Sequence, residues 1–462
     1  MTTVRIAGGQ GFYGDSVAGA ASVLEAGVDY LCLEALAELT LAILQKDRQK
    51  DESLGYTRDL PAYLRVALPY VASGRTKVVT NAGGINPVAA GRAAVATARE
   101  LGISGLKIAT VVGDDLTGRL GELAGSGQQL ANLETGEPWS GFPGGSDVRF
   151  ASAYLGARTI ADALGLGADV VITGRVADPS LFLGPLMFEH GWASDDWDLL
   201  AAGIALGHLC ECSGQSTGGN FSGEWWTIPR PEAFAYPIAE SGPDGTFVLS
   251  KAPGTGGRVD FDTVRHQLLY EVHDPCAYVT PDVVADFTAL RVEEESPDRV
   301  KVSTARGTEA TGTYKVLVAY GAGWAGESRV AFAWPDAASK ARATAAIFRS
   351  RVAMAGLEAD EWCEELFGLN ALGGPTVPLG AREVADEVAE VALRVAWRCG
   401  DPVTAGLIAR EMVPLALSAP PAGLSGTGRS TSARPSELLG LWPTLVAKSL
   451  VDKAVSIDLV EV

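Results

Sequence analysis

A histidine, a glutamate and a cysteine lie close together near the middle of the sequence. His208, Glu211 and Cys212 stand at positions i, i+3 and i+4 of a helix expected over residues 196–212, so they share one face of that helix. An imidazole, a carboxylate and a thiol on one face can transfer protons, activate a thiolate or bind zinc. The structural alternative is a mostly apolar helix in which buried His and Cys bond to the backbone. We hypothesise that the three residues are catalytic.

A glycine-rich loop with the sequence SGQSTGGN follows this helix. Glycine lets the backbone approach a ligand closely, and backbone amides in such a loop can bind an anion. We therefore expect Gln215, Thr217 and Gly218 to bind substrate.

A second glycine-rich turn follows the first expected strand. Gly9, Gly11 and Gly14 have the spacing G-x-G-x-x-G, and Glu34 comes about twenty residues later, which is typical of a dinucleotide-binding fold. An NAD(P)-dependent oxidoreductase is therefore one alternative for the function.

Three other residues of this turn favour a different ligand. Asp15 stands at the helix entrance that a pyrophosphate would occupy, and a carboxylate there competes with an anion. Phe12 and Tyr13 add bulk to the turn. We interpret Gly11, Phe12 and Tyr13 as one wall of a pocket for an acyl substrate.

Two further loops with polar residues follow expected strands. Asn81, Gly83 and Gly84 come after one strand, and Arg175 and Asp178 come after another. The planar guanidinium of Arg175 suits a substrate carboxylate, and the glycine amides suit an anion. Because the carboxyl ends of parallel strands meet at one edge of a sheet, these loops and the glycine turn predict a single site.

The first 222 residues alternate short apolar runs with helical patterns, which favours a parallel sheet covered by helices on both faces. Asp15-Ser16 and Asn86-Pro87 are placed to cap two of these helices. The predicted fold is a Rossmann-like, three-layer α/β domain. Its expected strands are residues 3–8, 28–34, 76–83, 106–113 and 168–175.

After residue 222 the pattern changes to alternating apolar and polar residues broken by Gly, Pro or Asp, which is typical of antiparallel, half-exposed strands. A helix is expected over residues 336–357, and two more are expected over residues 386–421. The sequence thus predicts two domains, an α/β domain over residues 1–222 and an α+β domain with an antiparallel sheet over residues 223–462.

The composition narrows the range of partners. The chain has 462 residues, of which 47% are hydrophobic, and a formal net charge of -19. A surface this acidic, with no basic run, argues against nucleic-acid or membrane binding. No secretory leader is evident. We expect a cytoplasmic enzyme that binds a small molecule and forms a homo-oligomer.

The six cysteines are scattered, and one C-x-C pair predicts neither a disulfide framework nor a metal site. P-loop, zincin and α/β-hydrolase motifs are absent from the sequence. Nothing in the sequence requires a cofactor, and the sequence does not identify one.

Several long segments resemble the acyclic terpene utilisation (AtuA-type) family. They include GGQGFYGDS, KVVTNAGGINP, VVITGRVADPSLFLGPLMFEHGW, AAGIALGHLCECSGQSTGGNF, RHQLLYEVHDPCAYVTPDVVADF and LGLWPTLVAKSLV, in order along nearly the whole chain. The resemblance implies metabolism of citronellol- and geraniol-type acids as their CoA thioesters. It also implies a separately encoded small partner subunit, since family members often carry a small carboxy-terminal domain.

Together these observations predict an enzyme that acts on a carboxylic acid or acyl-CoA by hydration, dehydration or carbon–carbon cleavage. His208 and Glu211 would transfer protons, glycine-loop amides would bind an oxyanion, and Cys212 would be a nucleophile or a spectator. The alternatives are the oxidoreductase and a non-catalytic scaffold for a partner subunit.

Overall fold

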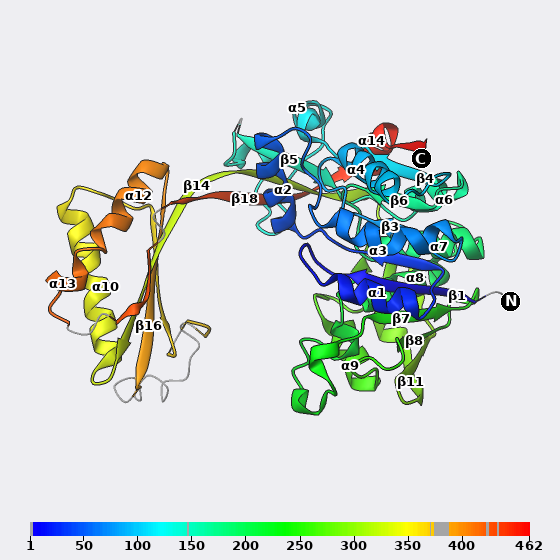
Figure 1. The fold of residues 1–462 in the computed structure, drawn as a ribbon. Coiled ribbons are helices and arrows are strands. Elements are labelled where there is room, and N and C mark those ends of the chain that lie inside the picture. The colour runs from blue at the N-terminus through cyan, green and yellow to red at the C-terminus, as the bar shows by residue number, and fades with distance from the viewer. Residues whose placement is uncertain (1–2, 146, 370, 374–387, 422–424, 432–433) are drawn as a thin grey trace. The chain divides into compact units, whose positions relative to one another are not determined.

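The computed structural model describes residues 3–145, 147–369, 371–373, 388–421, 425–431 and 434–462. The chain divides into two compact units (Figure 1): the first comprises residues 1–142, 149–318 and 442–462, and the second comprises residues 143–148 and 319–441. The predicted domain boundary near residue 222 falls inside the first unit. Among the described helices, none combines the length and the apolar character needed to cross a membrane.

Five parallel strands form the centre of the first unit. All five were expected from apolar runs in the sequence, and their pairs are parallel. In their order across the sheet they are β1 (Val4–Gln10), β2 (Tyr30–Leu33), β3 (Lys77–Thr80), β6 (Val170–Thr173) and β4 (Lys107–Val112).

Antiparallel strands extend this sheet at both edges, so it is mixed and has ten strands. β19 (Ser456–Glu461) pairs with β4, and β7 (Pro237–Ser241) pairs with β1. Antiparallel strands were expected in a separate sheet, but here they continue the parallel one. Beyond β7 the order is β8 (Phe247–Lys251), β12 (Arg299–Ser303) and β11 (Arg291–Ser296).

Helices bury both faces of the central strands. Alternate strand residues such as Leu31 and Val78 belong to one apolar core with α1 (Val17–Glu25), α3 (Leu60–Ala72) and α4 (Pro87–Glu100). Side chains that point the other way meet α7 (Ser180–His190) and α8 (Trp197–Cys210): the Cys32 thiol donates to the Leu181 carbonyl. Of the predicted cap residues, Ser16 and Asn86 cap their helices, since Ser16 accepts from the Ala18 amide and Asn86 from the Ala89 amide.

The remaining elements of the first unit lie around this sheet. A three-stranded sheet has the order β13 (Arg306–Thr308), β10 (Val284–Asp286) and β9 (Tyr278–Val279). The other elements are α2 (Glu38–Lys50), α5 (Leu120–Gly125), β5 (Val148–Ala153), α6 (Arg158–Gly165), α9 (Phe261–Leu269) and α14 (Lys448–Val451).

The second unit is an antiparallel sheet with helices on one face. The sheet order is β15 (Glu361–Phe367), β16 (Glu390–Cys399), β14 (Thr313–Ala333) and β17 (Ser425–Thr431), and β18 (Ser436–Ala447) also pairs with β14. The helices are α10 (Ala337–Met354), α12 (Pro402–Glu411) and α13 (Leu415–Ser418). Both β14 and β18 contain residues of both units.

One predicted helix of this unit is wrong. The first half of the helical prediction over residues 386–421 falls on β16, where every second residue is buried. These buried residues pack with α10 and α12 in one core. The period is therefore that of a strand with one covered face, while α10 and α12 are helices as expected.

Candidate active site

A cavity of about 750 Å³ lies in the first unit, beside the carboxyl ends of β1, β2 and β6 and the end of α8. Several residues that the sequence singled out from distant segments line it together, as expected for loops at one edge of a sheet. These are Gly11, Phe12, Arg175, Asp178, Glu211, Cys212 and Gln215.

The other predicted site residues are not among those that line the cavity. Thr217 is buried, and its hydroxyl donates to the carbonyls of Gly214 and Ala235. At Gly83 a Cβ would lie 2.4 Å from the Thr173 carbonyl oxygen, so this glycine permits close packing. The remaining residues of this group are Tyr13, Asn81, Gly84, His208 and Gly218.

His208 and Glu211 form a buried pair at the end of α8. Nε2 of His208 lies 2.8 Å from the Gln267 carbonyl oxygen, which can only accept, so Nε2 carries the hydrogen. Nδ1 of His208 lies 3.1 Å from Oε1 of Glu211. Oε2 of Glu211 is buried and has no hydrogen-bond partner among the described residues. One carboxyl oxygen therefore contacts the imidazole, and the other is free in the cavity wall.

Burial sets the protonation of this pair. It lowers the pKa of His208 to about 4, so the ring is neutral near pH 7. Burial, reinforced by the charges of Asp178 and Glu271, raises the pKa of Glu211 well above its ordinary value. Both pKa shifts are consistent with a protonated Glu211 that donates to the free lone pair on Nδ1 of His208. The pair thus holds one proton that can be exchanged.

Gln267 of α9 holds this pair in place through two hydrogen bonds with His208. In addition to accepting from His208, it donates from Nε2 to the His208 carbonyl at 2.8 Å and accepts from Gln215 Nε2 at 2.7 Å. Gln267 was not predicted from the sequence, because a glutamine on an amphipathic helix has no distinctive spacing. Its only signal is its neighbourhood, next to His266.

Arg175 is the centre of a second buried cluster. NH1 donates to the Leu36 carbonyl at 2.6 Å and lies 2.9 Å from an oxygen of Asp178. The guanidinium stacks on the Tyr154 ring, 4.2 Å from its centroid. The backbone amide of Arg175 donates to Asp114 at 2.8 Å. The expected substrate carboxylate would therefore compete with Asp178 for this arginine.

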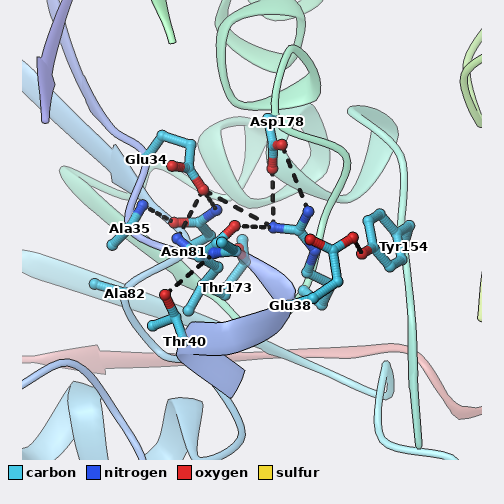
Figure 2. Close-up of polar contacts among 12 residues, drawn as sticks. Glu34, Ala35, Glu38, Thr40, Asn81, Ala82, Tyr154, Thr173 and Asp178 are labelled. Atoms are coloured by element: carbon cyan, nitrogen blue, oxygen red, sulfur yellow. Dashed lines mark hydrogen bonds and ion pairs between the residues drawn. The ribbon is translucent and has the colours of Figure 1, made fainter. Parts of the chain in front are cut away.

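Glu34 belongs to the same cluster (Figure 2), in which its Oε1 accepts from Asn81 at 3.0 Å and from the Leu36 amide at 2.7 Å. The nearest Arg175 nitrogen lies 3.9 Å away. Burial and the charge of Asp178 raise the pKa of Glu34 well above its ordinary value, although Arg175 opposes the shift. Glu34 is therefore a buried acid whose Oε1 already bonds within the protein.

Glu38 is an ionised carboxylate in the cavity wall. It accepts from the Tyr154 hydroxyl at 2.6 Å and lies 3.4 Å from Lys315 Nζ. Although burial raises its pKa, the Tyr154 hydrogen bond and the charges of Arg175 and Lys315 lower the pKa of Glu38 to about 2. Glu38, Lys315 and Tyr154 were not predicted from the sequence as site residues.

Two carboxylates already occupy the amides of the glycine turn. Asp15 accepts from the Gly11 amide at 2.9 Å and also from the hydroxyls of Ser213 and Tyr236. Asp59 accepts from the Gly14 amide at 2.9 Å. A pyrophosphate at this turn would meet both carboxylates, so the geometry does not favour the dinucleotide interpretation.

Cys212 lies in the cavity wall as a neutral thiol. Burial and the neighbouring Glu211 raise its pKa, which keeps the thiolate fraction, and hence the nucleophilicity, low. Among the described residues, no group of three or more His, Cys, Asp or Glu side chains has an arrangement that could hold a metal ion.

One family model matches the chain over residues 4–457, and its description is acyclic terpene utilisation family protein AtuA. The match covers nearly all of the chain and confirms the family that the sequence motifs indicate. Neither the curated proteins nor the solved structures gave a match.

Proposed function

The chain belongs to the acyclic terpene utilisation family, and from this premise we propose that it is an enzyme that adds water to, or removes it from, a branched acyl thioester or acid. One observation carries the proposal. Glu211 is buried in the cavity wall with one oxygen on His208 and the other without a partner among the described residues. This is the geometry of a group that exchanges a proton with a bound substrate.

The pair can move a proton in either direction. When Oε2 of Glu211 takes a proton from the substrate, the proton on Oε1 passes to Nδ1 of His208. In the reverse direction Nδ1 returns its proton to Oε1 while Oε2 donates. The bond from Nε2 to the Gln267 carbonyl holds the ring in this tautomer. Hydration of an α,β double bond needs such a proton at the α carbon, and dehydration removes it.

The rest of the wall supports an apolar, branched substrate. Phe12, Leu36, Phe234, Val279 and Leu445 line the same cavity as Glu211. Apolar side chains beside convergent polar groups are typical of a small-molecule site. A short isoprenoid chain would pack against these apolar side chains, and the family description supports it.

The test follows deuterium from solvent into the substrate. The protein in D₂O would be incubated with CoA thioesters of branched acids, such as the 3-methylbut-2-enoyl thioester, and mass spectrometry would read deuterium at the α carbon. We expect wild-type exchange to fall about 100-fold or more in Glu211→Gln. Glu100→Gln, an exposed helix residue, is the matched control. Exchange that is equal in Glu211→Gln and wild type would refute the proposed role.

A further inference from the structure

Three buried polar atoms of cavity-lining residues lack a hydrogen bond among the described residues. Oδ1 of Asp178 has its ion pair with Arg175, and the other two are Nε of Arg175 and Oε2 of Glu211, whose residues are only 3% and 6% exposed. Leaving such atoms unbonded is costly, so a ligand group is expected to satisfy them. Nε of Arg175 and Oε2 of Glu211 together present one N–H donor and one carboxyl oxygen.

Three of the other four N–H donors of the Arg175 guanidinium are already engaged. NH1 has the Leu36 carbonyl and Asp178, and NH2 lies 3.5 Å from the second Asp178 oxygen. A substrate carboxylate is usually held by two parallel N–H donors of an arginine. Arg175 still has Nε–H and the second N–H of NH2, so its donors alone would admit either a neutral oxygen or a carboxylate, and charge must distinguish the two.

The described residues that line the cavity supply no unpaired positive charge. Its lining contains two cations, Arg175 and Lys315. Arg175 pairs with Asp178 and Lys315 with Glu38. A ligand carboxylate beside Arg175 would therefore be buried without a counter-charge of its own, next to the carboxylate of Asp178, and such a charge is strongly disfavoured.

We infer that this end of the cavity selects a neutral oxygen, the thioester carbonyl or a hydroxyl of the substrate, and rejects a free carboxylate. The inference rests on the proposed function, because it names the substrate class of the same pocket. Asp178 is then a specificity determinant: by neutralising Arg175, it directs the site toward thioesters instead of acids.

Matched ligands test this without turnover. Octanamide, the N-acetylcysteamine thioester of octanoate, and octanoate itself share one chain and differ in the charge of the head group. Calorimetry at pH 7.5 should show that wild type binds the two neutral probes about tenfold or more tightly than octanoate. Equal or tighter binding of octanoate, or no binding of either neutral probe, would overturn the inference.

Asp178→Asn provides the second arm. It removes the counter-charge from Arg175, so the preference for neutral probes over octanoate should shrink by about tenfold or reverse. Asp162→Asn, which breaks an exposed arginine pair on α6, should leave the preference unchanged. If a folded Asp178→Asn protein keeps the wild-type preference for neutral probes over octanoate, Asp178 is not a specificity determinant. The wild-type ratio stays informative if this variant does not fold.

The two proposals fail separately. If the neutral probes bind better but Glu211→Gln keeps full exchange, the acid–base role is wrong and the selectivity stands. If exchange depends on Glu211 but octanoate binds as tightly as the amide, the selectivity is wrong and the acid–base role stands.

Discussion

Asn81 bridges the ends of two neighbouring parallel strands: its Nδ2 donates to Glu34 at 3.0 Å, while its Oδ1 accepts from the Ala35 amide at 2.7 Å. Leu33 and Thr80 are register partners at the ends of β2 and β3, so Glu34 and Asn81 come next on each strand. The side chain of Asn81 is fully buried. It therefore holds Glu34 in place beneath Arg175 instead of contacting a ligand.

Asn81→Leu should destabilise the protein. It leaves the Ala35 amide without its buried partner, at a cost of about 1–3 kcal/mol, while Oε1 of Glu34 keeps only the Leu36 amide. Urea denaturation would measure the fall in the free energy of unfolding. Gln49→Leu, at an exposed position of α2, should change it by less than about 0.5 kcal/mol. Similar values for both variants would contradict this role.

His208 should make stability depend on pH on the acid side. Burial lowers its folded pKa to about 4 from the ordinary 6.5, so its contribution is present above pH 6.5 and is lost as the pH falls toward 4. The stability difference between wild type and His208→Gln should therefore shrink by about 3 kcal/mol between pH 7 and pH 4. Chemical denaturation across that range would measure it. A difference that stays constant with pH would contradict a buried, neutral imidazole.

Glu211 should control the alkaline side of the activity profile. Because burial raises its pKa well above the ordinary value, the pair keeps its proton at neutral pH and loses it only in more alkaline solution. The rate of α-carbon exchange should therefore fall on an alkaline limb whose apparent pKa lies far above 4.5. A decrease in rate with an apparent pKa near 4.5 would instead indicate an ordinary exposed carboxylate. The residual α-carbon exchange of Glu211→Gln should not show the alkaline decrease in rate.

The part of the site that depends on local spacing could be predicted from the sequence, and the part that depends on long-range contacts could not. His208 and Glu211 are three residues apart on one helix, so their pairing could be predicted. Tyr154 and Glu38 are 116 residues apart, and Gln267 and His208 are 59 apart. Such pairs form only when strands and helices bring distant loops to one sheet edge, and a single sequence does not show which loops meet.

The fold was predictable where the apolar runs were unambiguous. The five parallel strands have continuous apolar sequences because both of their faces are buried. β16 instead alternates in EVALRVAWRC, and such a short run, rich in Ala, Leu and Arg, also fits a helix. The predicted cap of α1 was half right: Ser16 accepts from the Ala18 amide, while Asp15 turns toward Gly11 and Ser213.

Tyr154→Phe should remove one hydrogen bond and keep the ring beneath Arg175. Glu38 then loses the strongest of the contacts that lower its pKa, so its pKa should rise from about 2 toward 4.5. The stability that Tyr154 adds through Glu38 is present above pH 4.5 and is lost as the pH falls toward 2. The loss in Tyr154→Phe should therefore be about 1 kcal/mol at pH 7 and smaller at pH 3. Denaturation at both values would measure it, and a larger loss at pH 3 would contradict it.

Trp397 should be the critical side chain of the second unit. It is 2% exposed, its Nε1 donates to the Ala405 carbonyl at 3.0 Å, and its ring lies 5.6 Å from that of Phe348. Trp397→Ala opens a cavity between β16 and the helices, and large aromatic truncations cost about 3–5 kcal/mol. Trp225→Ala, with a ring that is 65% exposed, should cost little. Limited proteolysis with mass spectrometry should then show cleavage between residues 319 and 441 in Trp397→Ala while the first unit stays protected, and equal protection of both variants would contradict the packing role.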